Sequence, residues 1–317
     1  MQDVAGGSAE GMTGRFGDVV TAMITPFSAG GDLDIDGAVS LAGWLCRHGS
    51  DALVLAGSTG EGSTMTDGEK AELWRAVAGA VSVPVIANTG SADTRHAMEL
   101  TRIAGECGAA GILAVTPYYN RPSQAGIEAH FLAMASVTDL PVLLYDIPVR
   151  TGRRIARQTV LRLLERTPNI VGIKDAAGDV AGSAALVAAA PRSFDLYSGD
   201  DALTLPLLSV GARGVIGVAT HWAGKVFAEM ISAFRSGDVA AARELNAVLL
   251  GSYDFESTED APNPLPAKAA MRALGLPAGE CRLPLGAAPS WLEESARKVL
   301  DSLSSSRRGA ASADTRA

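Results

Sequence analysis

The sequence predicts a (β/α)8 barrel followed by a C-terminal helical region, and three observations lead to this prediction. Eight short runs rich in Val, Ile and Leu recur along the 317-residue chain, as expected of parallel strands that are buried on both faces. Segments with the apolar spacing of amphipathic helices separate most of these runs. The turn after the first run is Thr25-Pro26-Phe27, not the glycine-rich phosphate-binding turn of a doubly wound sheet.

We expect the eight runs to form the barrel strands in chain order. They lie at residues 19–24, 52–56, 84–87, 111–115, 141–145, 170–174, 194–197 and 214–218. The clearest helical segments between them are 36–48, 67–81, 93–107, 123–138 and 156–166, and several open on Asp or Ser, which are good N-caps. After residue 220 the strands stop, and helical patterns follow at 225–235, 240–250, 267–274 and 291–303. The chain therefore divides into a flexible tail (1–17), a TIM barrel (18–224), a helical region (225–303) and a second flexible tail (304–317).

Composition and charge exclude several functional classes. Hydrophobic residues make up 47% of the chain and charged residues 20%, so most of it is expected to fold. The net charge of −8 argues against nucleic acid or an anionic membrane as the main partner. Residues 1–15 lack the features of a signal peptide, and Arg213 and several glycines interrupt the longest apolar stretch. We expect a cytoplasmic protein without a membrane span.

Chemistry in β/α barrels takes place at the carboxyl ends of the strands, and Lys174 is the sharpest signal there. It closes the apolar run 170–173, whereas the other four lysines have polar neighbours. Burial inside a barrel would lower the pKa of this amine, and a neutral amine can attack a ketone to form an imine. The residues alone leave a second interpretation open, in which Lys174 pairs with the carboxylate of Asp175 or Glu61.

Three other strand ends carry polar side chains that suit an imine-forming lysine. Tyr145 can move protons there, although it can equally be a core tyrosine with a satisfied hydroxyl. Ser58 and Thr59 lie between two glycines, where they suit a bound carboxylate or simply form a turn or a helix cap. Arg150 can form a bidentate pair with a carboxylate of the substrate or a surface salt bridge.

The sequence predicts no metal centre. The four histidines show neither His-x-His nor His-Glu-x-x-His spacing, and only His221 lies near a strand end. Three cysteines without paired spacing predict neither a zinc site nor a disulfide framework. A nucleophilic Ser or Cys triad lacks a suitably placed histidine for the same reason.

Six motifs resemble, in the same order, those of the dihydrodipicolinate synthase/N-acetylneuraminate lyase family of class I aldolases. They are GSTGE at 57–61, TPYYNRPSQ at 116–124, YDIPVRTG at 145–152, GIKD at 172–175, SGDD at 198–201 and PNPLPAK at 262–268. The resemblance extends over most of the chain and implies lyase chemistry through a lysine Schiff base, with no metal or other cofactor. Arg150 and the run 120–124 are most similar to the synthase branch of the family.

For that branch, the resemblance implies condensation of pyruvate with L-aspartate 4-semialdehyde to give 4-hydroxy-tetrahydrodipicolinate, in lysine and diaminopimelate biosynthesis. Lys174 would form the imine with pyruvate. Tyr145, Ser58 and Tyr119 would form a proton relay, in which Tyr119 reaches into the site of a neighbouring subunit. The resemblance also implies a homotetramer built as a dimer of dimers.

The resemblance also implies which residues bind the two substrates. Thr59 and the amides of its loop, which begins at Gly57, would hold the carboxylate of pyruvate. Arg150 would hold the carboxylate of the semialdehyde, and the Ile216 carbonyl would contact the substrate end of the site. Many members bind lysine in a cleft at the dimer interface beside the position of Tyr118. The matching positions here hold His96, Ala92, Asp67 and Lys70, so we expect weak or no inhibition by lysine.

Two other functions stay open. The first is a related pyruvate-dependent aldolase or lyase that acts on a 2-keto acid sugar, and the second is a keto-acid sensor without turnover. The intact Lys174 and Tyr145 argue against the sensor. The sequence departs from the synthase pattern at Ser58, where Thr is usual, at Gly62, where Ser is usual, and at residues 217–222.

Overall fold

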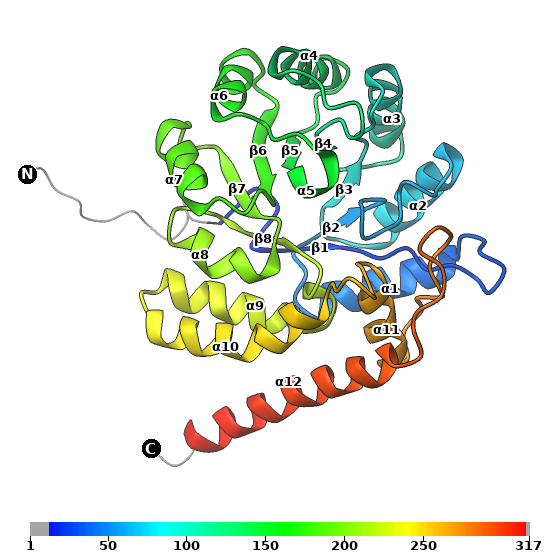
Figure 1. The fold of residues 1–317 in the computed structure, drawn as a ribbon, viewed down its shortest axis with the longest axis vertical. Coiled ribbons are helices and arrows are strands. Elements are labelled where there is room, and N and C mark those ends of the chain that lie inside the picture. Colours follow the sequence, from blue (N-terminus) through cyan, green and yellow to red (C-terminus); the bar gives the residue numbers. More distant parts are fainter. Residues whose placement is uncertain (1–12, 315–317) are drawn as a thin grey trace, which may run out of the picture.

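The protein is a closed barrel of eight parallel strands surrounded by helices, with further helices packed against one side (Figure 1). The structure, a computed structural model, describes the backbone of residues 13–314 and the side chains of residues 13–305. Residues 1–12 of the expected N-terminal tail lie outside this range. Neighbouring strands pair in chain order, and the eighth strand closes the barrel against the first. The prediction of a (β/α)8 barrel is confirmed.

Each strand lies within two residues of its expected position, because each apolar run is short and ends in polar residues or glycine. The strands are β1 (Val19–Ala22), β2 (Ala52–Leu55), β3 (Val85–Asn88), β4 (Gly111–Val115), β5 (Val142–Asp146), β6 (Ile170–Asp175), β7 (Asp195–Ser198) and β8 (Gly214–Gly217).

Alternate side chains of the strands belong to two separate cores. Those that point inward fill the barrel, where Val20, Ile86 and Leu113 belong to one interior cluster. Those that point outward, such as Leu53 and Leu55, belong to the layer between the sheet and its helices. Because side chains pack the barrel interior, the strand ends are the place where a cavity can form.

The helices follow the strands around the barrel and then continue in the C-terminal region. Around the barrel lie α1 (Ile35–Arg47), α2 (Asp67–Ala80), α3 (Thr94–Glu106), α4 (Gln124–Ala135), α5 (Pro148–Thr151), α6 (Arg157–Arg166), α7 (Val180–Ala189), the 3-10 helix η2 (Asp201–Leu203), α8 (Thr204–Leu208) and α9 (Thr220–Arg235). The C-terminal region holds α10 (Val239–Phe255), α11 (Leu265–Ala273) and α12 (Leu292–Asp314). Several helices begin where a side chain caps them, as Asp34 and Ser123 do.

The structure differs from the expectation at several helices: the short helices α5 and α8 were not expected, and three longer helices differ as follows. Helix α7 was not expected, because its ten residues include no charged side chain that would mark a polar face. Helix α9 begins at Thr220 and crosses the boundary expected at residue 224, because its first turn is buried and lacks amphipathic spacing. Helix α12 continues through Asp314, so that residues 304–314 are helical where a tail was expected; no proline stops the helix there.

Candidate active site

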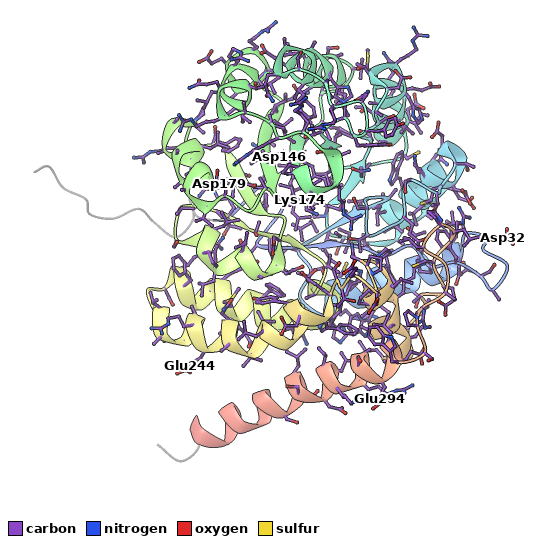
Figure 2. All side chains as sticks on the ribbon, in the orientation of Figure 1. Asp32, Asp146, Lys174, Asp179, Glu244 and Glu294 are labelled. Carbon is purple, nitrogen blue, oxygen red and sulfur yellow. The ribbon has the colours of Figure 1, made fainter. Side chains whose placement is uncertain are left out.

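The predicted site residues gather in a cavity at the carboxyl ends of the strands, with Lys174 near the middle of the barrel (Figure 2). The cavity has a volume of about 180 Å³. Six of the eight predicted residues line it: Gly57, Ser58, Thr59, Tyr145, Arg150 and Lys174. The two that do not are Tyr119 and Ile216.

Lys174 and Tyr145 form the centre of the cavity. They are paired in register on the neighbouring strands β5 and β6, and the Lys174 Nζ lies 4.4 Å from the centroid of the Tyr145 ring. Each residue is only 5% exposed. Burial lowers the pKa of the Lys174 amine to about 8 and raises the pKa of the Tyr145 phenol to about 12. A larger share of Lys174 is therefore neutral near physiological pH than of an exposed lysine, while Tyr145 keeps its proton.

The structure argues against the second interpretation of Lys174, in which it pairs with Asp175 or Glu61. The Asp175 carboxylate accepts hydrogen bonds from the Ala177 amide at 2.9 Å and the Ser183 hydroxyl at 2.5 Å. The Glu61 Oε1 lies 2.5 Å from the Nζ of Lys268 instead. Both carboxylates thus have partners of their own.

The loop after β2 turns sharply so that Ser58 and Thr59 face the cavity. Ala56 and Glu61, on either side of them, both adopt a left-handed conformation with φ of 53°. A Cβ on Gly62 would lie 2.0 Å from the Ala56 carbonyl oxygen, so this loop conformation requires glycine at the position where the sequence departs from the synthase pattern. The Ser58 hydroxyl hydrogen-bonds the phenol of Tyr145, which lowers the pKa of that phenol slightly against the effect of burial.

Arg150 lies at the mouth of the cavity on the short helix α5. Pro148 opens this helix, which ends at Gly152 in a left-handed conformation. Arg150 itself is exposed, but its charge is close enough to Lys174 to lower the pKa of the amine further. A cation at the mouth and a buried amine suit a substrate that carries a carboxylate.

Tyr119 and Ile216 lie outside the cavity. Tyr119 is 94% exposed and has a φ of 71°, which is rare for a residue with a bulky side chain. The two residues after Tyr119 fix the position of this loop through side-chain hydrogen bonds. The Asn120 side-chain amide donates to the Ala92 carbonyl, and the Arg121 guanidinium donates to the Gly152 carbonyl. The Ile216 side chain is fully buried in the interior of the barrel.

The C-terminal region contributes residues that the sequence did not single out as site residues. Glu256, Ser257 and Asn263 line the cavity beside Lys174. The Asn263 Nδ2 donates a 3.0 Å hydrogen bond to the Thr59 hydroxyl, which links this region to the loop after β2. Asn263 belongs to the motif at 262–268 and could have been selected from it, whereas Glu256 lies in no motif.

Residues 217–222, where the sequence departs from the synthase pattern, mainly support the fold and do not line the cavity, apart from Val218. The His221 Nε2 accepts from the Ile24 amide at 3.0 Å, and its Nδ1 lies 2.7 Å from the Val218 carbonyl oxygen. Burial lowers the pKa of His221 to about 4, in agreement with a neutral ring that donates through Nδ1 and accepts through Nε2. His221 therefore ties the end of β1 to the end of β8, and from this segment Val218 lines the cavity.

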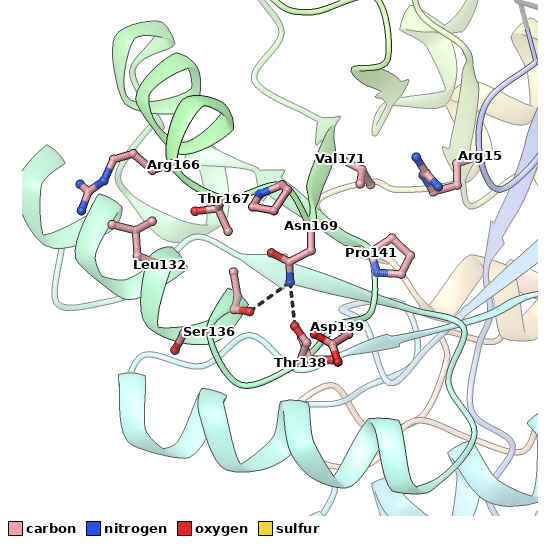
Figure 3. Close-up of a pocket in the computed structure, with 12 residues that line it drawn as sticks. Arg15, Leu132, Ser136, Thr138, Asp139, Pro141, Arg166, Thr167, Asn169 and Val171 are labelled. Carbon is pink, nitrogen blue, oxygen red and sulfur yellow. Dashed lines mark hydrogen bonds between the residues drawn. The ribbon is translucent and has the colours of Figure 1, made fainter.

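A larger hollow, of about 720 Å³, lies elsewhere and is open to solvent (Figure 3). Its walls come mainly from α4, the end of α6 and the segments that lead into β5 and β6. The Asn169 side chain lines the hollow and donates to the carbonyls of Ala135 and Thr138. Because it lies at the amino ends of the strands, away from Lys174, we do not assign the chemistry to it.

Metal-ligand clusters and disulfides were not expected. Among the side chains that the structure describes, those of residues 13–305, no group of three or more His, Cys, Asp or Glu is arranged to hold a metal ion. The three cysteines, Cys46, Cys107 and Cys281, are free. Within residues 13–314, no helix is long and apolar enough to cross a membrane.

An amine that burial keeps partly neutral can attack a carbonyl compound, and the phenol beside it can supply and recover the proton. The barrel and this cavity together define the class of lysine-dependent, imine-forming lyases of the class I aldolase type. The family is more specific: the model of the dihydrodipicolinate synthetase family matches residues 15–303, and the chain belongs to this family.

Relatives and solved structures agree with this assignment. A 4-hydroxy-tetrahydrodipicolinate synthase from Moorella thermoacetica is 48% identical over 273 residues, which cover 86% of this chain and 92% of that protein. The dihydrodipicolinate synthase of Cyanidioschyzon merolae, solved with lysine bound, is 42% identical with a TM-score of 0.89, over 92% of this chain and 99% of that one. The chloride-inhibited synthase of Acinetobacter baumannii, solved with pyruvate, is 35% identical with a TM-score of 0.85, over 90% and 98%.

Proposed function

We propose that this chain condenses pyruvate with L-aspartate 4-semialdehyde to give 4-hydroxy-tetrahydrodipicolinate, a step of lysine and diaminopimelate biosynthesis. The observation that carries the proposal is the buried Lys174–Tyr145 pair, which shares one cavity with Arg150. The similarity to synthases at 43% to 50% identity supports the same reaction.

Lys174 begins the reaction as a nucleophile. Its neutral amine attacks the ketone carbon of pyruvate, the nitrogen gives up its two protons, and the carbonyl oxygen takes up two protons and leaves as water, which gives an imine. Loss of a proton from the methyl group converts the imine to an enamine, whose terminal carbon attacks the aldehyde carbon of the second substrate. The amino group of that substrate then attacks the imine carbon, releases Lys174 and closes the ring.

Tyr145 supplies and recovers the protons of these steps. Its phenol stays protonated at neutral pH because burial raises its pKa to about 12. The hydrogen bond from Ser58 connects it to a relay, which Tyr119 of a neighbouring subunit completes. The exposure of Tyr119 supports this assignment, because a tyrosine held in a rare conformation in solvent suits a contact with another subunit.

The substrate carboxylates are assigned to two ends of the cavity. Thr59 and the backbone amides of its loop, that of Gly57 included, hold pyruvate, and Asn263 orients the Thr59 hydroxyl. Arg150 holds the carboxylate of the semialdehyde. The Ile216 carbonyl is assigned to the end of β8, although the side chain itself packs inside the barrel.

The proposal also covers the oligomeric state of the enzyme and its location in the cell. A relay completed by Tyr119 requires at least a dimer, and we propose a homotetramer built as a dimer of dimers in the cytoplasm. The catalytic steps use the covalent imine with pyruvate and call for no metal or organic cofactor. Aldolases for keto-acid sugars are the second candidate function, but Arg150 favours a second substrate that carries a carboxylate near the aldehyde.

Reductive trapping tests the imine directly. Borohydride added with pyruvate should attach a pyruvate-derived mass to the peptide that carries Lys174, and Lys174→Ala should remove this label. Lys298→Ala is the matched control, because Lys298 is an exposed lysine on α12. A label on another lysine would refute the assignment. Condensation with L-aspartate 4-semialdehyde, measured in the presence and absence of a chelator, then tests the second substrate and the independence from metal.

A further inference from the structure

The loop that carries Arg150 is closed at its base by one carboxylate. This Arg150 loop, residues 147–154, leaves β5 after Asp146 and leads into α6. The Asp146 Oδ1 accepts a 3.1 Å hydrogen bond from the Ile155 amide, so the residue before the loop binds the residue after it. Asp146 thereby fixes the two ends of the loop relative to each other.

The Arg150 loop is stiff within itself, whereas the Arg150 side chain has no anchor of its own. The Gly152 amide donates to the Pro148 carbonyl at 2.8 Å. The Thr151 hydroxyl donates to the Ile147 carbonyl at 3.1 Å. Among the side chains that the structure describes, none forms a hydrogen bond or an ion pair with the Arg150 guanidinium. The place of this guanidinium at the mouth of the cavity therefore depends on how the whole loop is anchored.

Asp146 occupies a position that is unfavourable for a carboxylate. Its side chain points away from the barrel interior into a hollow of about 340 Å³ between α6 and α7, and the residue is 3% exposed (Figure 2). Its partner in register on β6 is Asp175, a second acid. Burial, together with the Asp175 charge, raises the pKa of Asp146 to about 7. An asparagine would accept from Ile155 without this penalty, so the charge of Asp146 needs a separate explanation.

Arg154, the last residue of the loop, supplies that explanation. Its Nε lies 3.7 Å from the Asp146 Oδ2, and its Nη1 donates to the Asp179 Oδ2 at 2.8 Å. Because Asp179 is the N-cap of α7, the Arg154 guanidinium links the end of the loop both to β5 and to α7. The other charged groups that face Asp146 are Asp175 on β6 and the exposed Arg157, which also lines the hollow.

We propose that Asp146, together with Arg154, is a positioning residue that holds the Arg150 loop in the geometry that binds the second substrate. This inference rests on the proposed function, in which Arg150 binds the carboxylate of L-aspartate 4-semialdehyde. Asp146 lies on the outer face of the sheet and does not line the catalytic cavity. It acts through the Ile155 amide and, when it is charged, through Arg154.

A comparison of the two substrates separates this role from a general effect on the fold. Asp146→Ala removes both contacts, whereas Asp146→Asn keeps the acceptor for the Ile155 amide and removes only the charge. At about pH 8 we expect KM for the semialdehyde to rise about tenfold in Asp146→Ala and about threefold in Asp146→Asn, because a displaced guanidinium loses part of a charge-assisted hydrogen bond. The value of kcat and the rate of pyruvate trapping by borohydride should change by less than about twofold.

A double-variant cycle tests whether the effect passes through Arg150. In an Arg150→Ala background, neither Asp146 variant should raise KM for the semialdehyde further, because no guanidinium is left to position. Arg154→Gln should resemble Asp146→Asn, and both keep the test if Asp146→Ala is poorly folded. Arg162→Gln is the matched control, since it breaks a partly exposed ion pair on α6 with Glu128 and should leave this KM unchanged.

The pH dependence is a readout that a merely structural role would not move. As the pH falls through about 7, wild-type Asp146 takes up a proton and comes to resemble the Asp146→Asn variant. The ratio of the semialdehyde KM of Asp146→Asn to that of the wild type should therefore be largest near pH 8 and approach one near pH 6. The titration of Lys174 cancels in this ratio, because both enzymes share it.

Three results would overturn the inference. They are an unchanged KM for the semialdehyde in Asp146→Ala, equal losses with both substrates, and effects of Asp146→Ala and Arg150→Ala that multiply. A ratio that is constant between about pH 6 and pH 8 would overturn the role of the Asp146 charge. A wild-type enzyme that traps pyruvate but does not consume L-aspartate 4-semialdehyde would instead refute the proposed second substrate, and this inference with it.

Discussion

The ion pair between Lys268 and Glu61 gives the sharpest prediction about stability. Lys268 lies on α11 and Glu61 on the loop after β2, and their side chains are 1% and 0% exposed. The Nζ–Oε1 distance is 2.5 Å. Further contacts surround the pair: the Nζ donates to the Glu280 carbonyl at 2.9 Å and lies 4.4 Å from the centroid of the Phe27 ring. Lys268→Met removes the cation and leaves the Glu61 carboxylate buried.

The expected cost is large because the partner cannot reach water. Removing one member of a buried ion pair typically destabilises a protein by about 3–5 kcal/mol, which corresponds here to roughly 5–10 °C in Tm. After Lys268→Met, the Arg282 amide, 2.8 Å from Oε2, still donates to Glu61 but carries no charge to compensate the carboxylate. Glu61→Gln combined with Lys268→Met leaves no buried charge in the pair and should be less destabilising than the sum of the two single variants.

Thermal and urea unfolding at fixed protein concentration measure this effect. Lys298→Met is the matched control, since it breaks an exposed pair with Glu294 and should leave the midpoint unchanged. Because Glu61 and Thr59 share a loop, we also expect Lys268→Met to raise KM for pyruvate more than it lowers kcat. A loss below about 1 kcal/mol, or strictly additive effects of the two variants, would contradict a buried and coupled pair.

Four further predictions concern the cavity and the surface near it. The rate of imine trapping should rise with pH and level off above about pH 8, because burial lowers the pKa of Lys174 to about 8 and only the neutral amine reacts; a rate independent of pH between 6 and about 9 would contradict this. Arg150→Ala should slow the reaction with the semialdehyde about tenfold or more while pyruvate trapping persists, and equal losses in both steps would make Arg150 structural. Hybrids refolded from Lys174→Ala and Tyr119→Phe subunits should regain activity, because one site in each mixed dimer is intact; verified hybrids without activity would place Tyr119 outside the neighbouring site. L-Lysine should inhibit weakly, because Asp67 is already bound to His96 at 2.9 Å; half-maximal inhibition below about 1 mM in a dose–response curve would refute this expectation.

The barrel was predictable because its signal is local. Each strand is a short apolar run, and a run buried on both faces needs no knowledge of its partners to be recognised. Helices α7 and the first turn of α9 were missed for the converse reason, since segments buried on most sides lose the polar face that reveals a helical period. The site was found because Lys174 ends an apolar strand in a chain with few lysines.

The electrostatics of the cavity were not predictable from the sequence, because they arise between segments that are far apart in the chain. The pKa of Lys174 responds to Asp201 after β7, Arg150 on α5 and Glu256 after α10, and no local pattern indicates that these charges meet. The partner of Glu61 was equally unpredictable from the sequence. Glu61 was a candidate partner of Lys174, but the fold places it against Lys268. A motif therefore indicates which residue types the chemistry uses, while the pairing of charges has to be derived from the packing of the C-terminal region against the barrel.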